Sequence, residues 1–499
     1  MSTITINQPE LPLILSLDIG TSSVRAMLFD RLGRAVEGLA ARGTYNICTT
    51  VNGMSEIDAD TILRIVWRCL DDLLVQSSFR SGQIGGVATC TLVSNILGVD
   101  RAGRAITPII TYADTRPAND VATLRTMFDE VEVHNRTGCL FHTSYLPARL
   151  LWMARTQPEL FDQVARWLSI GEYMELQLFG EASVSYSVAS WTGLLNRRLL
   201  VWDEALIEKL PVRGDQLSPL TDVHIPRRRL RQPFAERWPP LHDVPWFPAI
   251  GDGAAANVGS GCVSPARVAL TVGTTTAIRV VMPEPLENVP WGLWCYRIDR
   301  QRLLPGGALS EGGNVFAWLK SILRLPEVSK LESDLAAMQP DTHTLTVLPF
   351  LAGERSPGWA GHAKATIHGL TLANTPMDIL RAGLEAVSYR VGLTFDLLKP
   401  LLPSDAEIVG SGGALLNSPV WLQIMADVLG RPVAVSQVQE ASARGTALLA
   451  LESLGALADV SDAPAFVGDV YQPDADRHIR YRQAIKHQEA LYEKLLQQE

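Results

Sequence analysis

The stretch "LSLDIGTSSVRAMLFD" at Leu15–Asp30 has a counterpart in the second half of the chain, "ALTVGTTTAIRVVMP" at Ala269–Pro283. Each consists of an apolar run, a glycine followed by three hydroxyl residues, and a second apolar run with one arginine. This pattern predicts two β-hairpins of the same design, and therefore two related halves. Only the first copy carries a carboxylate, Asp18, where the second has Thr271 or Val272.

A turn made of glycine and hydroxyl residues presents backbone N–H and side-chain O–H donors at one point, which suits phosphate oxygens. One such turn is equally typical of an ordinary hairpin, but two matched turns indicate two halves that face each other across a polyphosphate. Mg²⁺ prefers one or two carboxylates together with water and substrate phosphates. A carboxylate in only one copy fits this arrangement, because a second would repel the nucleotide. An Asx contact that stabilises the hairpin is the alternative for Asp18.

Length and composition limit the possible classes. The chain has 499 residues, of which 47% are hydrophobic and 19% are charged, as expected for two large domains or a few smaller ones. The net charge of −9 argues against nucleic acid or an anionic membrane as the main partner. The six cysteines form no C-x-x-C pair, so we expect buried free thiols in a reducing compartment. No signal peptide or membrane-spanning run is evident, which predicts a cytoplasmic protein.

Strand-like and helical segments alternate, which indicates an α/β fold. We expect an N-terminal domain at 11–257, a C-terminal domain at 258–455 and an extension with a final polar amphipathic helix at 456–499. The periodicity predicts helices at 58–77, 145–168 (interrupted by Pro158), 313–324 and 377–399, a strand-like segment at 84–100, irregular connections at 210–250, and a strand followed by a glycine-rich turn and a helix at 406–433.

Taken in order, the motifs of the chain resemble the FGGY carbohydrate kinases of the actin-like ATPase superfamily. The motifs are "DIGTSSVRAMLFD" (18–30), "TYADTR" (111–116), "YSVASWTGLLN" (186–196), "GDGAAANVGSG" (251–261), "VGTTTA" (272–277), "GERSPGW" (353–359), "ATIHGLTLANTPMDILRAGLE" (365–385) and "VGSGGALLNSPVWLQIMADVLGRPV" (409–433). The resemblance implies two actin-like (ribonuclease H-like) ATPase domains that face each other across a central cleft. It also implies an ATP-dependent kinase for a hydroxyl of a small sugar or sugar acid, gluconate-like or xylulose-like.

The resemblance assigns the chemistry to individual residues. Asp252 matches the general base that takes the proton from the attacking hydroxyl, although an acid between glycines can also be a simple turn. Asp18 matches the metal residue, acting on Mg²⁺ through water. The expected ATP-binding residues are Thr21, Ser22 and Ser23 in the first turn, Gly273, Thr274 and Thr275 in the second, and Gly313, Gly412, Gly413 and Asn417 around the adenosine.

The substrate pocket departs from the family pattern. Tyr112 and Asp114 are expected to bound it, whereas Arg116 is as readily explained as a structural ion-pair partner. Many family members have a histidine-containing motif where this chain has Val93, Ser94 and Asn95. We assign Ser94 and Asn95 to the substrate site, and expect a smaller-walled pocket that either accepts a bulkier or differently oxidised sugar or is weakened in activity.

Two other functions compete with the kinase. A catalytically weak sugar- or nucleotide-binding sensor on the same fold would explain the altered 93–95 stretch, but a sensor has no need of Asp252. A chaperone-type or filament-type ATPase is disfavoured, because the chain has no separate peptide-binding domain and carries the sugar-kinase motifs. An apolar-faced C-terminal half is also compatible with a homodimer.

Overall fold

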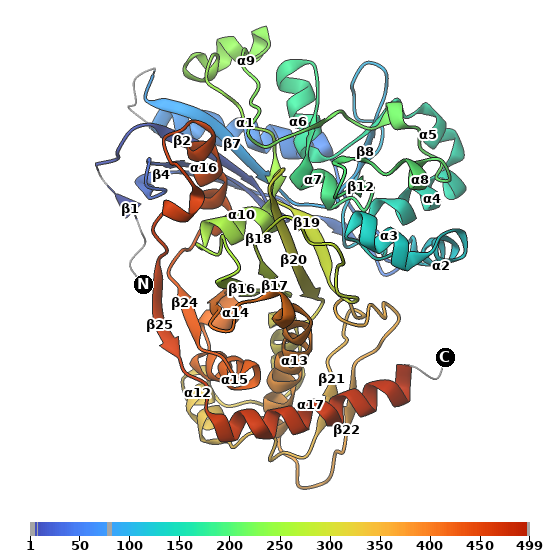
Figure 1. Cartoon of the computed structure of the whole chain (residues 1–499), viewed down its shortest axis with the longest axis vertical. Helices are drawn as coiled ribbons and strands as arrows, with labels where there is room; N and C mark the ends of the chain where they lie inside the picture. Colours follow the sequence, from blue (N-terminus) through green and yellow to red (C-terminus); the bar gives the residue numbers. More distant parts are fainter. Residues whose placement is uncertain (1–4, 7, 77–81, 497–499) are drawn as a thin grey trace.

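Two mixed β-sheets, one in each lobe of the molecule, organise the structure (Figure 1). The computed structural model describes residues 5, 6, 8–76 and 82–496. The first sheet has the strand order β1 (Thr5–Ile6), β4 (Ala35–Thr44), β3 (Ser23–Phe29), β2 (Leu13–Ile19), β7 (Ile84–Thr91) and β15 (Ile250–Gly251). The second has the order β18 (Met282–Pro283), β20 (Arg302–Leu309), β17 (Thr276–Val280), β16 (Arg267–Val272), β23 (Glu407–Ser411), β24 (Val433–Ser436) and β25 (Val467–Tyr471), with β19 (Trp294–Arg297) paired to β20.

The two sheets share a five-strand core. In the first, β2 pairs antiparallel with β3 and parallel with β7, while β4 and β15 extend the two sides. In the second, β16 pairs antiparallel with β17 and parallel with β23, while β20 and β24 extend the two sides. The predicted α/β class and the predicted duplication of the hairpin are therefore confirmed.

Helices cover both faces of the first sheet, which explains why all seven residues of β2 are buried. Leu13, Leu15 and Leu17 belong to the same core cluster as the apolar face of α1 (Ala59–Gln76), the helix predicted at 58–77. Ile14, on the opposite face of the strand, packs in another cluster with α16 (Ala441–Ser453). A strand covered on both sides reads as a continuous apolar run rather than an alternating one.

Helix α16 comes late in the chain but lies in the first lobe, beside β2 (Figure 1). It crosses α10 (Asp252–Gly259) at two glycines. A Cβ on Gly445 would lie 1.9 Å from the carbonyl oxygen of Ala255, and a Cβ on Gly259 would lie 1.8 Å from that of Ala441. The backbones of the two helices therefore touch, and this contact fixes the helix that begins with Asp252.

Residues between β7 and β15 form a mainly helical region on the first lobe. Its helices are α2 (Ala118–Met127), α3 (Glu130–Thr137), α4 (Leu146–Thr156), α5 (Pro158–Gln163), α6 (Ile170–Phe179), α7 (Tyr186–Ser190), α8 (Glu204–Ile207) and α9 (Gln232–Arg237), with short strands that include β8 (Leu97–Val99), β10 (Arg166–Leu168) and β14 (Leu220–Thr221). Pro158 does divide the helix predicted at 145–168. That helix ends at Gln163, however, because the residues of β10 pair antiparallel with β8, a long-range contact without a local sequence signal.

In the second lobe, α11 (Gly313–Ile322), α13 (Pro376–Leu398) and α15 (Pro419–Leu429) agree with the predicted helices. The segment that follows α16 completes this lobe. β25 pairs antiparallel with β24, and α17 (Ala475–Leu496) buries Tyr481, Ala484, Ile485 and Gln488. The predicted extension at 456–499 is thus an integral part of the second sheet and its helical cover. Its last three residues lie outside the described residues.

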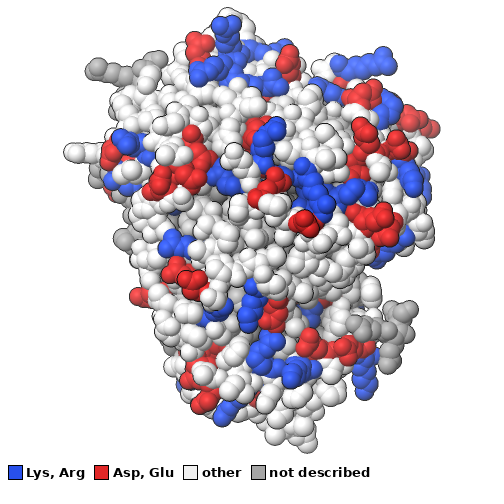
Figure 2. All heavy atoms as spheres, viewed as in Figure 1, with Lys and Arg blue, Asp and Glu red and all other residues white. Residues whose placement is uncertain are grey.

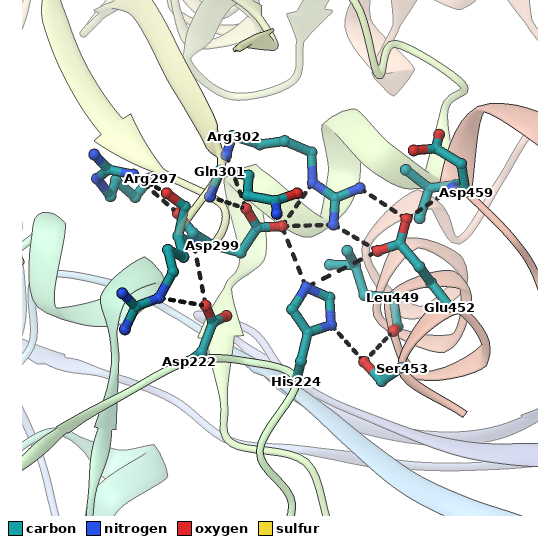
Figure 3. A network of polar contacts seen from close by, with 12 residues as sticks. Asp222, His224, Arg297, Asp299, Gln301, Arg302, Leu449, Glu452, Ser453 and Asp459 are labelled. Carbon is teal, nitrogen blue, oxygen red and sulfur yellow. Dashed lines mark hydrogen bonds and ion pairs between the residues drawn. The ribbon is translucent and has the colours of Figure 1, made fainter. Parts of the chain in front are cut away.

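A polar network joins three segments that are distant in sequence (Figure 3). Nδ1 of His224 lies 2.6 Å from the hydroxyl of Ser453, and Nε2 lies 3.5 Å from a carboxylate oxygen of Asp299. Arg302 forms ion pairs with Asp299 at 2.5 Å and with Glu452 at 2.6 Å. The network ties the turn between β19 and β20 to the end of α16 and to the loop after β14.

On the face shown in Figure 2, basic and acidic side chains lie next to one another rather than in separate patches. Within the described residues, no helix combines the length and the apolar character needed to cross a bilayer. Five of the six cysteines are buried as expected, but Cys48 is exposed because the short strand β5 (Cys48–Thr49) lies at the surface.

Candidate active site

The two predicted turns open onto the same cavity. In the first, the Gly20 amide donates to the Ser23 carbonyl at 3.0 Å; in the second, the Gly273 amide donates to the Thr275 carbonyl at 3.0 Å. Thr21 and Thr275 both line a cavity of about 250 Å³ between the lobes. Ser22, Thr274 and Thr275 are exposed, so their donors are accessible, whereas Ser23 is buried.

Asp18 lies near the end of β2 and is 5% exposed. One of its carboxylate oxygens accepts a hydrogen bond from Nη1 of Arg25 at 3.2 Å, and the other accepts one from the thiol of Cys90 at 3.4 Å. Burial raises the pKa of Asp18, although the charge of Arg25 opposes this. Arg25 also pairs with Glu440 at 3.1 Å, so Asp18 belongs to a chain of charges at the edge of the first hairpin.

Asp252 is the first residue of α10, directly after β15. Because β15 pairs with Cys90 and Thr91 of β7, and Asp18 of β2 pairs with Cys90 from the other side, the two aspartates are carried by strands that flank β7. Burial and the negative charge of Asp18 raise the pKa of Asp252 to about 6. A Gly253 amide donates to its carboxylate at 2.7 Å. Asp252 lines the cavity and is mostly ionised at neutral pH.

Stacked aromatic side chains also line the cavity and form an aromatic wall. The rings of Trp191 and Tyr296 stack at 3.6 Å between centroids, and those of Trp294 and Tyr296 at 4.2 Å. The hydroxyls of Tyr145 and Tyr296 are 2.5 Å apart. The complete lining consists of Thr21, Val93, Ser94, Tyr112, Ser144, Tyr145, Trp191, Asp252, Gly253, Thr275, Thr276, Ala277, Arg279, Trp294, Tyr296, Ala308, Arg355 and Trp359. Such a wall offers apolar faces to the C–H groups of a polyol.

Two predicted substrate residues do not line this cavity. The side-chain amide of Asn95 donates to the Leu92 carbonyl at 2.7 Å and accepts a hydrogen bond from the Ile170 backbone amide at 2.9 Å. The carboxylate of Asp114 is fully buried and accepts hydrogen bonds from the Ser55 amide at 2.9 Å and from Arg116. Both side chains hold neighbouring loops in place. The expectation that Arg116 forms a structural ion pair is confirmed, since it also pairs with Glu56.

Ser94 does line the cavity, and two buried interactions fix it there. Its hydroxyl donates to the Trp191 carbonyl at 2.6 Å, and its φ of 51° turns the chain at the end of β7. The guanidinium of Arg149 donates to the carbonyls of Ser94, Thr143 and Ser144. A planar cation with several donors is needed to hold three carbonyls at once.

The predicted adenosine residues contact the second hairpin. The Gly313 amide donates to the Gly273 carbonyl at 2.8 Å, and a Cβ on Gly313 would lie 2.8 Å from that of Ala414. Gly412 has a φ of 91°, and a Cβ there would lie 2.4 Å from the Val272 carbonyl oxygen. The structure therefore brings Gly313, Gly412 and the second turn together. Gly413 begins the short helix α14 (Gly413–Leu416), and Asn417 caps its end.

Several cavity residues were not assigned from the sequence. Trp191, Arg355 and Trp359 lie inside the motifs that carry the family resemblance, and Arg279 is the arginine of the repeated hairpin. The sequence therefore pointed to these residues without indicating what they do. No sequence motif pointed to Trp294 or Tyr296, because these residues reach the cavity only through the pairing of β19 with β20.

Comparison with known proteins relates the chain to sugar kinases over nearly its whole length. Residues 13–259 match the N-terminal domain of the FGGY family of carbohydrate kinases, and residues 268–454 match its C-terminal domain. A gluconokinase of Bacillus subtilis is 25% identical over 482 residues, which cover 94% of this chain and 93% of that protein. An autoinducer-2 kinase of Yersinia enterocolitica is 27% identical over 505 residues, covering 96% and 94%. The crystal structure of a xylulose kinase from Lactobacillus acidophilus superposes with a TM-score of 0.90 at 25% identity, covering 97% of this chain and 98% of that one.

The two halves of the chain thus match the N-terminal and the C-terminal domain of one enzyme family, in that order. The class is that of the sugar kinases, phosphotransferases that act on an alcohol group and take the phosphate from ATP. Within this class, the chain belongs to the FGGY family of carbohydrate kinases.

Proposed function

We propose that this protein transfers the γ-phosphate of Mg-ATP to a hydroxyl of a small sugar or sugar acid, gluconate-like or xylulose-like, with Asp252 as the general base. The observation that carries this proposal is the position of Asp252. Its carboxylate lines the cavity between the two hydroxyl turns and has a pKa of about 6. A base with this pKa is ionised at neutral pH and still accepts a proton as the hydroxyl attacks.

The two turns fit the phosphates of ATP. Their exposed hydroxyls and backbone amides come from both lobes, and Gly412 and Gly313 let the backbone of the predicted adenosine segment pack directly against the second turn. Phosphoryl transfer depends mostly on positioning and charge neutralisation, which such fixed donors supply. The aromatic wall offers an apolar surface to the acceptor, and displacing water from this surface would make hydrolysis compete less with transfer.

Asp18 fits Mg²⁺ through coordinated water better than by direct contact. Each of its carboxylate oxygens already accepts a hydrogen bond, from Arg25 and from Cys90, and Mg²⁺ usually keeps several of its waters. When bound, Mg²⁺ supplies charge neutralisation on the phosphates. Asp18 itself would hold the ion through this water with a buried carboxylate close to the first turn.

The test combines a substrate panel with one substitution. ADP release is measured with Mg-ATP against pentuloses, hexuloses, aldonates, glycerol and tetritols. At least one acceptor is expected to stimulate turnover far above ATP alone, and Asp252→Asn should lower its kcat by about 10²- to 10⁴-fold, the usual contribution of general-base catalysis. Calorimetric ATP binding and thermal unfolding of the variant should be unchanged. Near-normal turnover by the variant would remove Asp252 from this role. A flat panel with intact ATP binding would contradict the kinase and favour the sensor.

A further inference from the structure

The first hydroxyl turn has backbone donors that the fold leaves free. Thr21 lines the cavity, and within the described residues no acceptor is found for the backbone amide of Thr21 or of Ser22. In the second turn, the amides of Thr274 and Thr275 also have no acceptor in the part of the chain that the structure describes. Free amides at a cavity are donors for an anion. Their use depends on where the backbone carbonyls of the turn point, because a carbonyl oxygen repels a phosphate oxygen.

Tyr45 binds two carbonyls of the first turn. Its hydroxyl donates to the Gly20 carbonyl, and its backbone amide donates to the Ser22 carbonyl at 3.1 Å. The register of the first sheet places it there, because Ser23 pairs with Thr44 at the end of β4 and Tyr45 is the next residue. The aromatic ring is buried in the same core cluster as the apolar residues of β2 and β3. Tyr45 therefore reaches the turn from the protein interior and does not line the cavity.

The second turn is held at the equivalent place by a different group. The Gly273 carbonyl accepts a hydrogen bond from the Gly313 amide at 2.8 Å, and the Thr274 carbonyl accepts one from the Asn314 amide at 3.1 Å. In that lobe the chain enters α11 after β20, and the start of the helix meets the turn. After β4 the chain continues into the short strand β5 instead, and the tyrosine side chain supplies the donor. Both turns thus have their glycine carbonyl bound, although the donors differ.

The hydrogen bond to the Gly20 carbonyl determines where the next amide points. In a trans peptide the C=O and the N–H point in opposite directions, so a carbonyl directed at Tyr45 turns the Thr21 amide away from Tyr45. Thr21 lines the cavity, whereas Tyr45 does not. Glycine has more backbone freedom than other residues, so the peptide after Gly20 would turn over readily if its carbonyl were released. The reversed peptide would present an oxygen in place of the N–H.

The surroundings of the Tyr45 hydroxyl keep it a donor. Burial, together with the negative charges of Asp18 and Asp252, raises the pKa of Tyr45 well above its usual range, so the hydroxyl keeps its proton at neutral pH. The influence of both carboxylates also shows that this hydrogen bond lies close to the two aspartates of the site.

We propose that Tyr45 is a positioning residue for the phosphates of the nucleotide: its hydroxyl fixes the peptide between Gly20 and Thr21, so that the Thr21 amide donates to a phosphate oxygen. This inference rests on the proposed function, because it concerns how the first turn binds ATP. Tyr45 acts only through the turn and contacts neither nucleotide nor acceptor.

A purely structural tyrosine is the competing explanation. In that case the hydroxyl contributes to the stability of the first lobe and to nothing else. A structural hydroxyl affects unfolding and leaves nucleotide affinity unchanged. A positioning hydroxyl affects the affinity for nucleotide and the mobility of the first turn, and leaves the KM for the acceptor unchanged.

The experiment uses Tyr45→Phe, which removes the hydroxyl and keeps the buried ring. The affinity for Mg-AMPPNP, a nonhydrolysable ATP analogue, measured by calorimetry, and kcat/KM for ATP should each fall by about 5- to 100-fold, the effect of leaving a buried carbonyl without its donor. Hydrogen–deuterium exchange of the free protein should become faster in peptides that cover the first turn and stay unchanged in those that cover the second.

Tyr173→Phe is the matched control. It removes another buried tyrosine hydroxyl from the first lobe, one that donates to Asp60 at 2.7 Å. Nucleotide affinity and exchange at the first turn should therefore equal those of the wild type.

Three results would overturn the inference. One is wild-type affinity for Mg-AMPPNP in Tyr45→Phe, and another is an equal loss of affinity in Tyr45→Phe and Tyr173→Phe, which would mean general destabilisation of the lobe. The third needs no variant, and so decides the matter even if a substitution prevents folding: Mg-AMPPNP that fails to protect the first turn of the wild type from exchange. A wild type that binds Mg-AMPPNP but phosphorylates no acceptor would contradict the proposed function and leave these comparisons intact, whereas a wild type that binds no nucleotide would overturn both.

Discussion

Asp18 and Thr271 hold the same place in the two hairpins, two residues before the glycine of the turn, and each accepts a hydrogen bond of 3.2 Å from an arginine of the following strand. The acid in the first copy pairs with its arginine and leaves a carboxylate at the edge of the first turn. The hydroxyl in the second copy leaves its arginine charged and unpaired. The single carboxylate therefore makes one hairpin suited to a hydrated cation and the other to an anion.

This relationship predicts the effect of making the copies identical. Thr271→Asp should pair with Arg279 and place a second carboxylate beside the phosphates, so kcat/KM for ATP is expected to fall at least about tenfold through like-charge repulsion. Thr271→Asn, which has nearly the same shape without the charge, is the control. Steady-state kinetics with varied ATP checks the prediction, and equal effects of Asp and Asn would show that shape rather than charge matters at this position.

The pH dependence of the reaction should report Asp252. Burial and the charge of Asp18 raise its pKa to about 6 in the free enzyme, so kcat/KM for the acceptor should fall as pH decreases through about 6, where the base becomes protonated. The charge of Arg279 lowers this pKa, and Arg279→Gln should therefore move the acid limb to higher pH. An acid limb that does not move in this variant would belong to another group.

The crossing of α10 and α16 predicts a site that tolerates no side chain. Because the added Cβ would lie 1.9 Å from the Ala255 carbonyl oxygen, Gly445→Ala should force the helices apart and lower the free energy of unfolding by about 1–3 kcal/mol. Gly214 is the matched control, because a Cβ added there would have no other atom within 4 Å. Urea denaturation of the two alanine variants compares them. Equal stability would mean that the helices can separate without cost.

Much of this architecture could be predicted from the sequence, because it depends on local patterns. The apolar runs around Gly20 and Gly273, and the periodicity of 58–77, each lie within one short segment. The residues around Asp252 were equally visible as a motif. All of these are features in which the hydrophobic period or the turn chemistry alone determines the structure.

The composition of the cavity could not be predicted in the same way. Asn95 and Asp114 are near cavity residues in sequence, but a buried polar side chain takes whichever partner is closest in space, and here those partners are backbone groups and Arg116. Tyr296 reaches the cavity only because β19 pairs with β20. Likewise, nothing local in the sequence of α16 shows that it packs on the first sheet.

The network around His224 predicts a stability that depends on pH (Figure 3). The hydrogen bond to Asp299 raises the pKa of His224, although burial opposes it. Folding therefore favours the protonated form. The stabilisation is fully present below the unfolded-state pKa, about 6.5, and is lost as pH rises through the higher value of the folded state. His224→Gln should thus destabilise the protein more at pH 5.5 than at pH 9, measured by urea denaturation at both pH values. His368→Gln, at an exposed histidine, is the control and should show little change at either pH. A gap between wild type and His224→Gln that stays constant from pH 5.5 to 9 would mean that His224 stabilises the network as a neutral hydrogen-bonding group, through Ser453, and not through its charge.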